Sequence, residues 1–260
     1  MRVLTWNVNS IRTRLPRLLA MLEREQPDIV CLQELKVPDD GMPLMELAAA
    51  GYSAAVNGQA GRNGVAVLAR EEPKEIARIF PGDPTPEDAR MMAARVGDVT
   101  AISVYVINGQ VTGSPAYVAK LQWLKAFRSW LDVTFEPSEP LVIAGDFNVC
   151  SDERDLWDPA GWEGHCHFTD PERAEVRALT GWGLTDLFRI HTPDGGHFSW
   201  WDYRAGAFHK RMGLRIDLMF ATEPLASRCR EVRIDRNERR PKAGPGAPSD
   251  HAPVIADFDD

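Results

Sequence analysis

The chain has 260 residues, of which 44% are hydrophobic and 26% are charged, and its formal net charge at pH 7 is −8. This is the composition of an ordinary globular protein, and the length allows a core that needs no disulfide bonds. No stretch approaches the ~20 apolar residues of a membrane span, and the N-terminus becomes polar too early for a signal peptide. The four cysteines lack the paired spacing of zinc or redox motifs. We therefore expect a reduced cytoplasmic protein without a membrane partner.

Short apolar runs rich in β-branched residues recur along the chain and predict strands. In chain order they occupy residues 3–8, 28–33, 64–69, 99–107, 141–145, 214–220 and 252–258. Residues 15–22 and 118–131 carry apolar side chains at the i, i+3, i+4, i+7 spacing of a helix. The irregular stretches 72–92 and 235–250, rich in Pro, Asp and Arg, are expected to be surface loops. Mixed strands and helices without long linkers predict one layered α/β or α+β domain over residues 1–260.

Polar side chains flank six of the predicted strands at the point where the strand begins or ends. In chain order they are Asn7, Glu34, Tyr105 with Asn108, Asp146 with Asn148, Asp217, and Asp250 with His251. A single residue of this kind more often terminates a strand than catalyses a reaction. Six positions together predict a shared site, because polar groups at successive strand ends can converge on one rim of a sheet.

The motifs that the sequence lacks limit the chemistry of this site. No Gly-x-Ser-x-Gly occurs, which argues against a serine hydrolase, and no glycine-rich phosphate loop occurs, which argues against nucleoside triphosphate hydrolysis. Oxygen donors from Glu34, from Asn7 and from Asp217 or Asp250 suit Mg²⁺ or Mn²⁺. A metal of this kind neutralises a phosphate and polarises its P–O bonds.

Attack of water on a phosphate also requires a group that moves a proton. Asp146 and His251 are the two candidates, and the amide of Asn148 can hold a phosphate oxygen or orient the water without adding charge. The set of side chains therefore predicts metal-assisted hydrolysis of a phosphodiester or a phosphomonoester.

The overall acidity is unusual for a nucleic-acid binder, since proteins that bind phosphate backbones tend to carry a basic face. The charge is unevenly distributed, however. One stretch is crowded with Arg204, His209, Lys210, Arg211 and Arg215, and seven more Arg and Lys residues follow between 228 and 242. A run of charge is usually a solvated face. The acidity also suits a protein that gathers carboxylates around a divalent metal.

Four motifs resemble the endonuclease/exonuclease/phosphatase superfamily: "WNVNSIR" at 6–12, "LQELK" at 32–36, "NGVAVLAR" at 63–70 and "GDFNV" at 145–149. Three more narrow the resemblance to the exonuclease III family of DNA-repair nucleases: "FSWWDYR" at 198–204, "GLRIDLMFA" at 213–221 and "PSDHAPV" at 248–254. The resemblance implies a four-layer α/β sandwich in which two mixed sheets lie face to face with helices outside. It also implies a Mg²⁺-dependent nuclease that combines abasic-site endonuclease, 3′→5′ exonuclease and 3′-end-cleaning activities.

The resemblance assigns roles to the polar residues at the strand ends. Glu34 matches the main metal ligand, Asn7 supports the metal site, and Asp250 can face the metal. Tyr105 matches a residue that contacts the scissile phosphate, and Asn108 lies beside it.

The resemblance also outlines a path for the proton. Asp146 is the acid/base candidate, and Asn148 orients the phosphate or the water. Asp217 matches a carboxylate that supports His251, because a carboxylate on one ring nitrogen fixes the tautomer of an imidazole and raises its basicity. Whether Asp146 or His251 accepts the proton of the water stays open.

Further positions are matched to substrate contacts. The apolar pocket for a base-free sugar is assigned to Trp200, Leu214 and Ile216. The DNA backbone contacts are assigned to Arg204, Lys210, Arg211 and Arg215. His167 occupies a place where relatives with strong abasic-site activity carry small residues, and we expect it to favour 3′ ends over internal abasic sites.

The expected function is therefore that of a monomeric DNA-repair nuclease that acts on duplex DNA with abasic sites or 3′ ends. Two other functions are alternatives to it. One is a superfamily phosphohydrolase acting on RNA or on a lipid or inositol phosphate, against which the "WDYR" and "GLRID" segments argue. The other is a catalytically inert DNA-binding module, against which the presence of Glu34, Asp146 and His251 argues.

Overall fold

The structure, a computed structural model, describes residues 1–259, and within them twelve strands form two mixed six-stranded sheets. The first sheet has the spatial order β11-β12-β1-β2-β4-β3. Its strands are β1 (Arg2–Asn7), β2 (Ile29–Gln33), β3 (Ser53–Asn57), β4 (Val65–Ala69), β11 (Cys229–Ile234) and β12 (Val254–Phe258). The second sheet has the order β5-β6-β7-β8-β10-β9. Its strands are β5 (Lys74–Ala77), β6 (Met91–Val96), β7 (Val99–Tyr105), β8 (Leu141–Asp146), β9 (Leu184–Asp186) and β10 (Asp217–Thr222).

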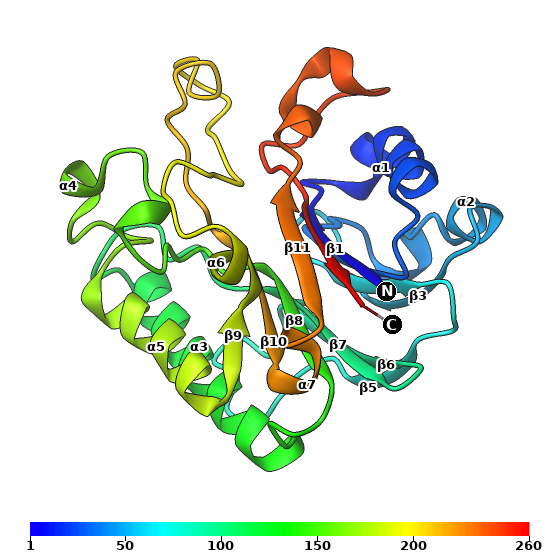
Figure 1. Ribbon diagram of the computed structural model, residues 1–260, viewed down its shortest axis with the longest axis horizontal. Coiled ribbons are helices and arrows are strands. Elements are labelled where there is room, and N and C mark those ends of the chain that lie inside the picture. The colour runs from blue at the N-terminus through cyan, green and yellow to red at the C-terminus, as the bar shows by residue number, and fades with distance from the viewer. Residues whose placement is uncertain (260) are drawn as a thin grey trace.

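Helices cover the outer faces of both sheets (Figure 1). The α-helices are α1 (Ile11–Glu25), α2 (Leu44–Ala49), α3 (Pro115–Thr134), α4 (Pro159–Trp162), α5 (Asp170–Trp182), α6 (Leu187–His191) and α7 (Glu223–Ala226). Short 3₁₀ helices are η1 (Asp39–Gly41), η2 (Glu153–Asp155), η3 (Arg236–Arg239) and η4 (Pro241–Ala243). In the part of the chain that the structure describes, no helix combines the length and the apolarity that crossing a membrane requires.

Three apolar layers hold the sheets and helices together. Residues of both sheets form the intersheet core, among them Val3, Cys31, Val67, Met92, Ala101, Ala144 and Met219. A second cluster joins the outer face of the second sheet to α3 and α5, and a third joins the outer face of the first sheet to α1 and α2. The order helix, sheet, sheet, helix is the four-layer sandwich expected from the resemblance, and that expectation is confirmed (Figure 1).

The central strands are apolar on both faces because both faces are covered. Successive side chains of a strand point to opposite sides. In β1, Val3 therefore lies in the intersheet core, whereas Leu4 and Trp6 pack against α1 and its neighbours. This double burial explains why the sequence shows continuous apolar runs here instead of alternation.

Each of the seven predicted runs contains a strand, and the two predicted helices are α1 and α3. Five strands were not predicted: β3, β5, β6, β9 and β11. The expectation of a surface loop over residues 72–92 is wrong in part, because β5 and the start of β6 lie there and Met91 and Met92 are buried. β6 joins the sheet as one arm of a hairpin with β7, which the composition of residues 72–92 does not reveal.

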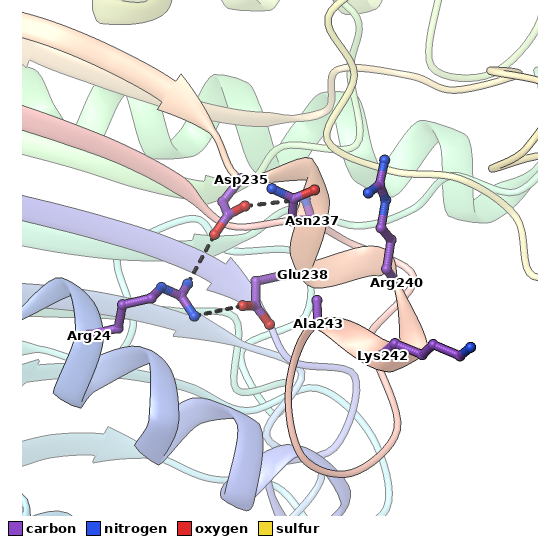
Figure 2. A pocket seen from close by; sticks show the side chains of 7 residues that line it. All are labelled: Arg24, Asp235, Asn237, Glu238, Arg240, Lys242 and Ala243. Carbon is purple, nitrogen blue, oxygen red and sulfur yellow. Dashed lines mark hydrogen bonds and ion pairs between the residues drawn. The ribbon is translucent and has the colours of Figure 1, made fainter.

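The stretch 235–250 was also expected to be a surface loop, and much of it is exposed, but it contains η3 and η4 and is anchored to α1. The buried guanidinium of Arg17 pairs with the carboxylate of Glu238 at 3.1 Å. Its two terminal nitrogens also donate to the backbone carbonyls of residues 238, 240, 241, 244 and 246. Figure 2 shows that Arg24, which also belongs to α1, pairs with Asp235 and Glu238. The segment that leads into Asp250 and His251 is thus anchored before the site begins.

Arg215 was expected to contact DNA phosphates, and the structure contradicts this. Its side chain is 1% exposed, and it donates to Asp155 at 2.6 Å and to Asp186 at 2.7 Å. Asp155 also accepts a hydrogen bond from Arg189. The carboxylates satisfy the guanidinium inside the protein, so Arg215 ties the segment before β10 to η2 and β9.

We predict that Arg215→Met lowers the free energy of unfolding by about 3–5 kcal/mol, because it leaves the buried carboxylate of Asp155 and the partly buried one of Asp186 with one cation fewer. Urea unfolding of the variant and the parent measures this difference. Arg204→Met is the matched control, since Arg204 is exposed and should leave the urea midpoint unchanged. Equal midpoints for Arg215→Met and the parent would contradict a structural role for Arg215.

Candidate active site

The predicted polar residues meet at one end of the sandwich because the strand registers align their ends. Parallel pairing of β7 with β8 sets Tyr105 opposite Asp146, and antiparallel pairing of β8 with β10 sets Asp146 opposite Asp217. In the first sheet, Asn7 ends β1, and Glu34 directly follows the end of the parallel strand β2. Both sheets therefore deliver polar side chains to the same rim.

These side chains surround a cavity of about 180 Å³, here called the active-site hollow. It is lined by Glu34, Tyr105, Asn108, Asp146, Asn148, His167, Trp200, Leu214, Ile216, Asp250 and His251. Asn7 and Asp217 lie behind this lining and bond to it. The predicted convergence of the strand ends is thus present in the structure.

Asn7 links the carboxylates contributed by the two sheets. Its Nδ2 donates to Glu34 Oε1 at 2.8 Å and to Asp146 Oδ2 at 3.0 Å. Its Oδ1 accepts from the backbone N–H of Asn9 at 3.0 Å. Asn7 therefore acts behind the hollow as a donor that holds two carboxylates close together, and its side-chain oxygen is already occupied by the Asn9 backbone N–H.

Three groups could hold a cation. Ligand atoms of Glu34, Asp146 and His251 all lie within 4.8 Å of one another. Carboxylate oxygens are the donors that Mg²⁺ and Mn²⁺ prefer, and such ions keep several waters. Asp250 lines the same hollow, but its two oxygens already accept hydrogen bonds from Asn9 at 2.9 Å and Trp200 at 3.1 Å. A direct bond from Asp250 to the metal stays a prediction.

Lys36 and Asn9 belong to the same network but were not singled out in the sequence. Lys36 Nζ lies 2.8 Å from Glu34 Oε2 and donates to Asn9 Oδ1 at 2.6 Å. Both Glu34 and Lys36 have left-handed backbone, with φ of 53° and 58°. This uncommon conformation of two neighbouring non-glycine residues turns both side chains toward the site. Asn9 lies inside the motif "WNVNSIR" and Lys36 inside "LQELK", and membership of these motifs is the sequence signal that could have identified them.

His251 is bound between two carboxylates. Its Nδ1 lies 2.8 Å from Asp217 Oδ2, which is the pairing predicted from the sequence, and its Nε2 lies 3.7 Å from Asp146 Oδ2. Ser249 Oγ accepts from the His251 backbone N–H and donates to the carbonyl of Asn7. The imidazole is therefore fixed at one nitrogen and presents the other to the hollow.

Crowding of carboxylates in a buried site changes their acidity. Burial raises the pKa of Asp146 to about 7, with Asp217 and Glu34 adding to the increase and His251 opposing it. Burial alone would lower the pKa of His251, but the charges of Asp217 and Asp146 raise it to about 10. Burial and the charges of Glu34 and Asp146 hold the pKa of Tyr105 well above its usual value. Tyr105 is therefore a neutral hydroxyl at physiological pH.

Asn148 organises the opposite side of the hollow. Its backbone N–H donates to Asp146 Oδ1 at 3.0 Å, and its side chain donates to the carbonyl of Val106 at 2.9 Å. Asn108 Nδ2 in turn donates to Asn148 Oδ1 at 3.1 Å. The Nδ1 of His167 lies 2.6 Å from the Asn148 carbonyl. Asn108, Asn148 and His167 are thus one hydrogen-bonded group.

A buried ion pair between Lys120 and Glu172 supports this group, and neither residue was singled out from the sequence. Lys120 Nζ bonds to Glu172 and donates to the carbonyl of Asn148 at 2.6 Å. Glu172 accepts from the backbone N–H groups of His167 and Thr169, both at 3.0 Å. Lysine and glutamate are almost never fully buried unless paired. The pairing spans 52 residues of sequence, so no local pattern announces it.

The predicted apolar contacts also meet at the hollow. Leu214 and Ile216 are 1% and 3% exposed, and Trp200 forms single β-bridges with Leu214 and His251. The predicted phosphate contacts lie elsewhere: Arg204 is exposed and pairs with Asp202 at 2.7 Å, and Lys210 and Arg211 are exposed.

Comparison with known proteins assigns the family. The sequence pattern of the endonuclease/exonuclease/phosphatase family matches residues 4–251. The chain belongs to this family. It is 34% identical over 270 residues to exodeoxyribonuclease III of Haemophilus influenzae, a match that covers 99% of this chain and 100% of the relative.

Two solved structures share this fold. The 3′ phosphatase NExo from Neisseria, bound to a product DNA hairpin, is 36% identical with a TM-score of 0.94, covering 100% of this chain and 99% of the other. An AP endonuclease from Archaeoglobus fulgidus is 33% identical with a TM-score of 0.95, covering 100% of both chains. Proteins with this fold are thus described as having different activities.

We predict that His251 in the metal-free protein titrates near pH 10, and that Asp217→Asn lowers its pKa by roughly 1–3 units because an adjacent negative charge is lost. The direction of the pKa shift of His251 also predicts how stability depends on pH. The folded-state value exceeds the reference value of 6.5, so His251 adds stability below about pH 6.5 and loses it as the pH rises toward about 10.

The titration is followed by NMR of the histidine ring protons in excess chelator, with the exposed His209 as the internal reference. An unchanged His251 midpoint in Asp217→Asn would show that the short contact between these residues carries no charge effect.

Proposed function

We propose that this protein is a divalent-metal-dependent DNA-repair nuclease that hydrolyses phosphodiester bonds of duplex DNA. The observation that carries the proposal is the meeting of Glu34, Asp146 and His251 in one hollow, with Asp217 bonded behind the imidazole. Family membership and the similarity to exodeoxyribonuclease III support it. Because the metal-binding groups and the His–Asp pair are assembled, nothing favours an inert binding module.

The donor set fits a hard divalent cation. Glu34 provides the carboxylate that would hold the cation at the edge of the hollow, and its ligand atom lies within 4.8 Å of those of Asp146 and His251, which act on the proton and the phosphate. Mg²⁺ is our assignment, with Mn²⁺ as a substitute, because carboxylate and water ligands suit both. When bound, the metal neutralises the phosphate and polarises its P–O bonds.

The side chains around the hollow carry out the proton transfer and contact the phosphate. Asp146, whose pKa of about 7 suits proton transfer near neutral pH, accepts a proton from the attacking water. His251 presents Nε2 to the phosphate while Asp217 holds Nδ1. Tyr105 keeps its proton and donates its hydroxyl to a phosphate oxygen.

Asn148 and Asn108 hold the substrate from the opposite side. Their amides are bonded to each other, so a phosphate oxygen meets a preformed polar surface that carries no charge. Preformed donors of this kind stabilise developing charge without reorganising. Trp200, Leu214 and Ile216 form the apolar wall against which the sugar packs.

We predict that Glu34→Gln reduces cleavage about 10²-fold or more and weakens Mg²⁺ binding, because the amide keeps the shape but removes the negative charge that attracts the cation. A labelled duplex with one abasic site, assayed with and without Mg²⁺, measures cleavage, and calorimetry measures Mg²⁺ binding. Glu46→Gln, at an exposed position of α2, is the matched control. Full cleavage by the parent in excess chelator would refute the metal mechanism.

Among the activities of such nucleases, we propose a preference for 3′ ends over internal abasic sites. His167 lines the hollow next to the apolar wall, where an abasic sugar would have to enter after leaving the duplex. Its ring is fixed by the contact with the Asn148 carbonyl, and burial lowers its pKa to about 4, so it is neutral at physiological pH. The description of the similar NExo protein as a 3′ phosphatase supports this preference.

We predict that His167→Gly raises the rate on an internal abasic duplex roughly tenfold, the effect of relieving about 1.4 kcal/mol of the flipping penalty. The φ of His167 is 81°, a conformation that glycine adopts without strain, so the backbone should keep its course. Rates on the abasic duplex and on a recessed 3′ end are compared. An unchanged ratio of the two rates would exclude a selective role for His167.

The expectations that the protein works in the cytoplasm and as a monomer stay predictions from the sequence.

A further inference from the structure

A second cavity adjoins the active-site hollow, and one side chain separates the two. This cavity, here called the Trp162 hollow, has a volume of about 420 Å³. It is lined by Gln110, Val111, Thr112, Trp162, Gly164, His165, Cys166 and His167. His167 also lines the active-site hollow, so its imidazole is a shared wall. The volume lies within the ~300–1,000 Å³ typical of small-ligand sites.

The lining of the Trp162 hollow is uncharged in a protein that is 26% charged. None of the eight described residues that line it is Asp, Glu, Lys or Arg. The cavity beside α1 in Figure 2 is the opposite case, with five charged side chains around it. A phosphate placed in the Trp162 hollow would find no Lys or Arg among these lining residues to pair with it. The lining therefore suits a neutral group.

Aromatic rings give this neutral site a shape. The rings of Trp162 and His167 lie 6.1 Å apart at an angle of 49° and form two tilted walls. Val111 adds an apolar surface that is 69% exposed, and Gln110 and Thr112 add amide and hydroxyl groups. Flat heterocycles stack on tryptophan irrespective of sequence, and their edges carry donors and acceptors. A nucleobase has these properties.

One buried apolar cluster lies beneath both cavities. Trp162 and Trp200 pack against the same buried cluster, which contains Leu214 and Ile216. A nucleotide whose sugar rests on Trp200, Leu214 and Ile216 therefore lies against the same apolar cluster that Trp162 packs on.

The shared wall is rigid. The backbone N–H of His167 donates to Glu172 at 3.0 Å, and its ring contacts the Asn148 carbonyl at 2.6 Å. Glu172 in turn pairs with the fully buried Lys120. On the other side, Thr112 Oγ1 donates to the carbonyl of Gly164 at 3.0 Å and ties two lining segments together. A preformed cavity spares the ligand the entropy of ordering it.

We propose that the Trp162 hollow is a subsite for the nucleobase of the 3′-terminal nucleotide that the enzyme removes. This inference rests on the proposed function. With the scissile phosphate among Glu34, Asp146 and His251, the base of the departing nucleotide passes His167 and stacks on Trp162. A 3′-terminal phosphate has no base and does not use the subsite, so Trp162 distinguishes two kinds of 3′ end.

The test compares Trp162→Ala with the parent on two recessed duplexes that differ only at the 3′ end, one bearing an unmodified nucleotide and the other a 3′-phosphate. Loss of one stacking contact should raise KM for nucleotide removal about tenfold and leave kcat unchanged. Removal of the 3′-phosphate should stay within about twofold of the parent, which also shows that the variant is folded. Trp162→Phe should restore most of the KM, since it keeps an aromatic face.

Trp157→Ala is the matched control, because Trp157 is 41% exposed and lies five residues earlier, outside the lining of the hollow. Equal effects of Trp162→Ala on the two substrates, or no effect on either, would overturn the subsite.

A second measurement does not depend on turnover. A deoxynucleoside 5′-monophosphate, titrated by calorimetry, should bind Trp162→Ala about tenfold more weakly than the parent, whereas inorganic phosphate should bind both alike. A parent inactive on both duplexes would contradict the proposed function, and equal affinity for the monophosphate would contradict the subsite.

Discussion

The intersheet core is the constraint on which the site depends, because each sheet supplies only part of the catalytic groups. Asn7 and Glu34 come from the first sheet, whereas Tyr105, Asp146 and Asp217 come from the second. The hydrogen bond from Asn7 to Asp146 crosses between the sheets at 3.0 Å and therefore reports their alignment. Displacements of about 1 Å can reduce catalysis about 10²-fold. Packing between the sheets thus matters for activity as much as for stability.

The site gathers charge that folding alone would disfavour. Burial together with neighbouring carboxylates raises the pKa of Asp146 to about 7, so the metal-free site binds a proton that a solvated aspartate would release. Asp217 Oδ1 is buried and has no hydrogen-bond partner among residues 1–259, an arrangement that costs about 1–3 kcal/mol in typical proteins. Sites that concentrate such unfavourable groups are usually kept for function. A divalent cation would relieve the repulsion and stabilise the folded state.

The sequence was most informative where local pattern and function coincide. Seven strands appear in the sequence as apolar runs because most of their residues are buried on both faces: β1, β2, β4, β7, β8, β10 and β12. Edge strand β5, with the sequence KEIA, is largely exposed, and β11, with the sequence CREVRI, is half charged, so neither resembles those runs. The residues around the hollow could be predicted because they lie inside motifs.

Residues that act through long-range ion pairs escaped prediction for a different reason. Lys120 lies on a helix, and Arg215 lies in a basic stretch, and both would ordinarily be assigned to solvent. Their partners are 52 residues away for Glu172 and 60 for Asp155. Only the fold brings these charges together, and only their burial shows that Arg215 cannot bind DNA phosphates.

These buried cations have a role that differs from simple stabilisation. A buried ion pair is often no more stable than apolar residues of the same volume, since desolvation offsets the attraction. Apolar residues, however, cannot donate directional hydrogen bonds to backbone carbonyls. Arg17 donates to five backbone carbonyls of the segment before Asp250, and Lys120 donates to the carbonyl of Asn148. Asn148 and His167 both have left-handed backbone, with φ of 52° and 81°, and such conformations persist only where their surroundings enforce them. The buried ion pair supplies that enforcement, because Lys120 holds the carbonyl of Asn148 and its partner Glu172 holds the backbone N–H of His167.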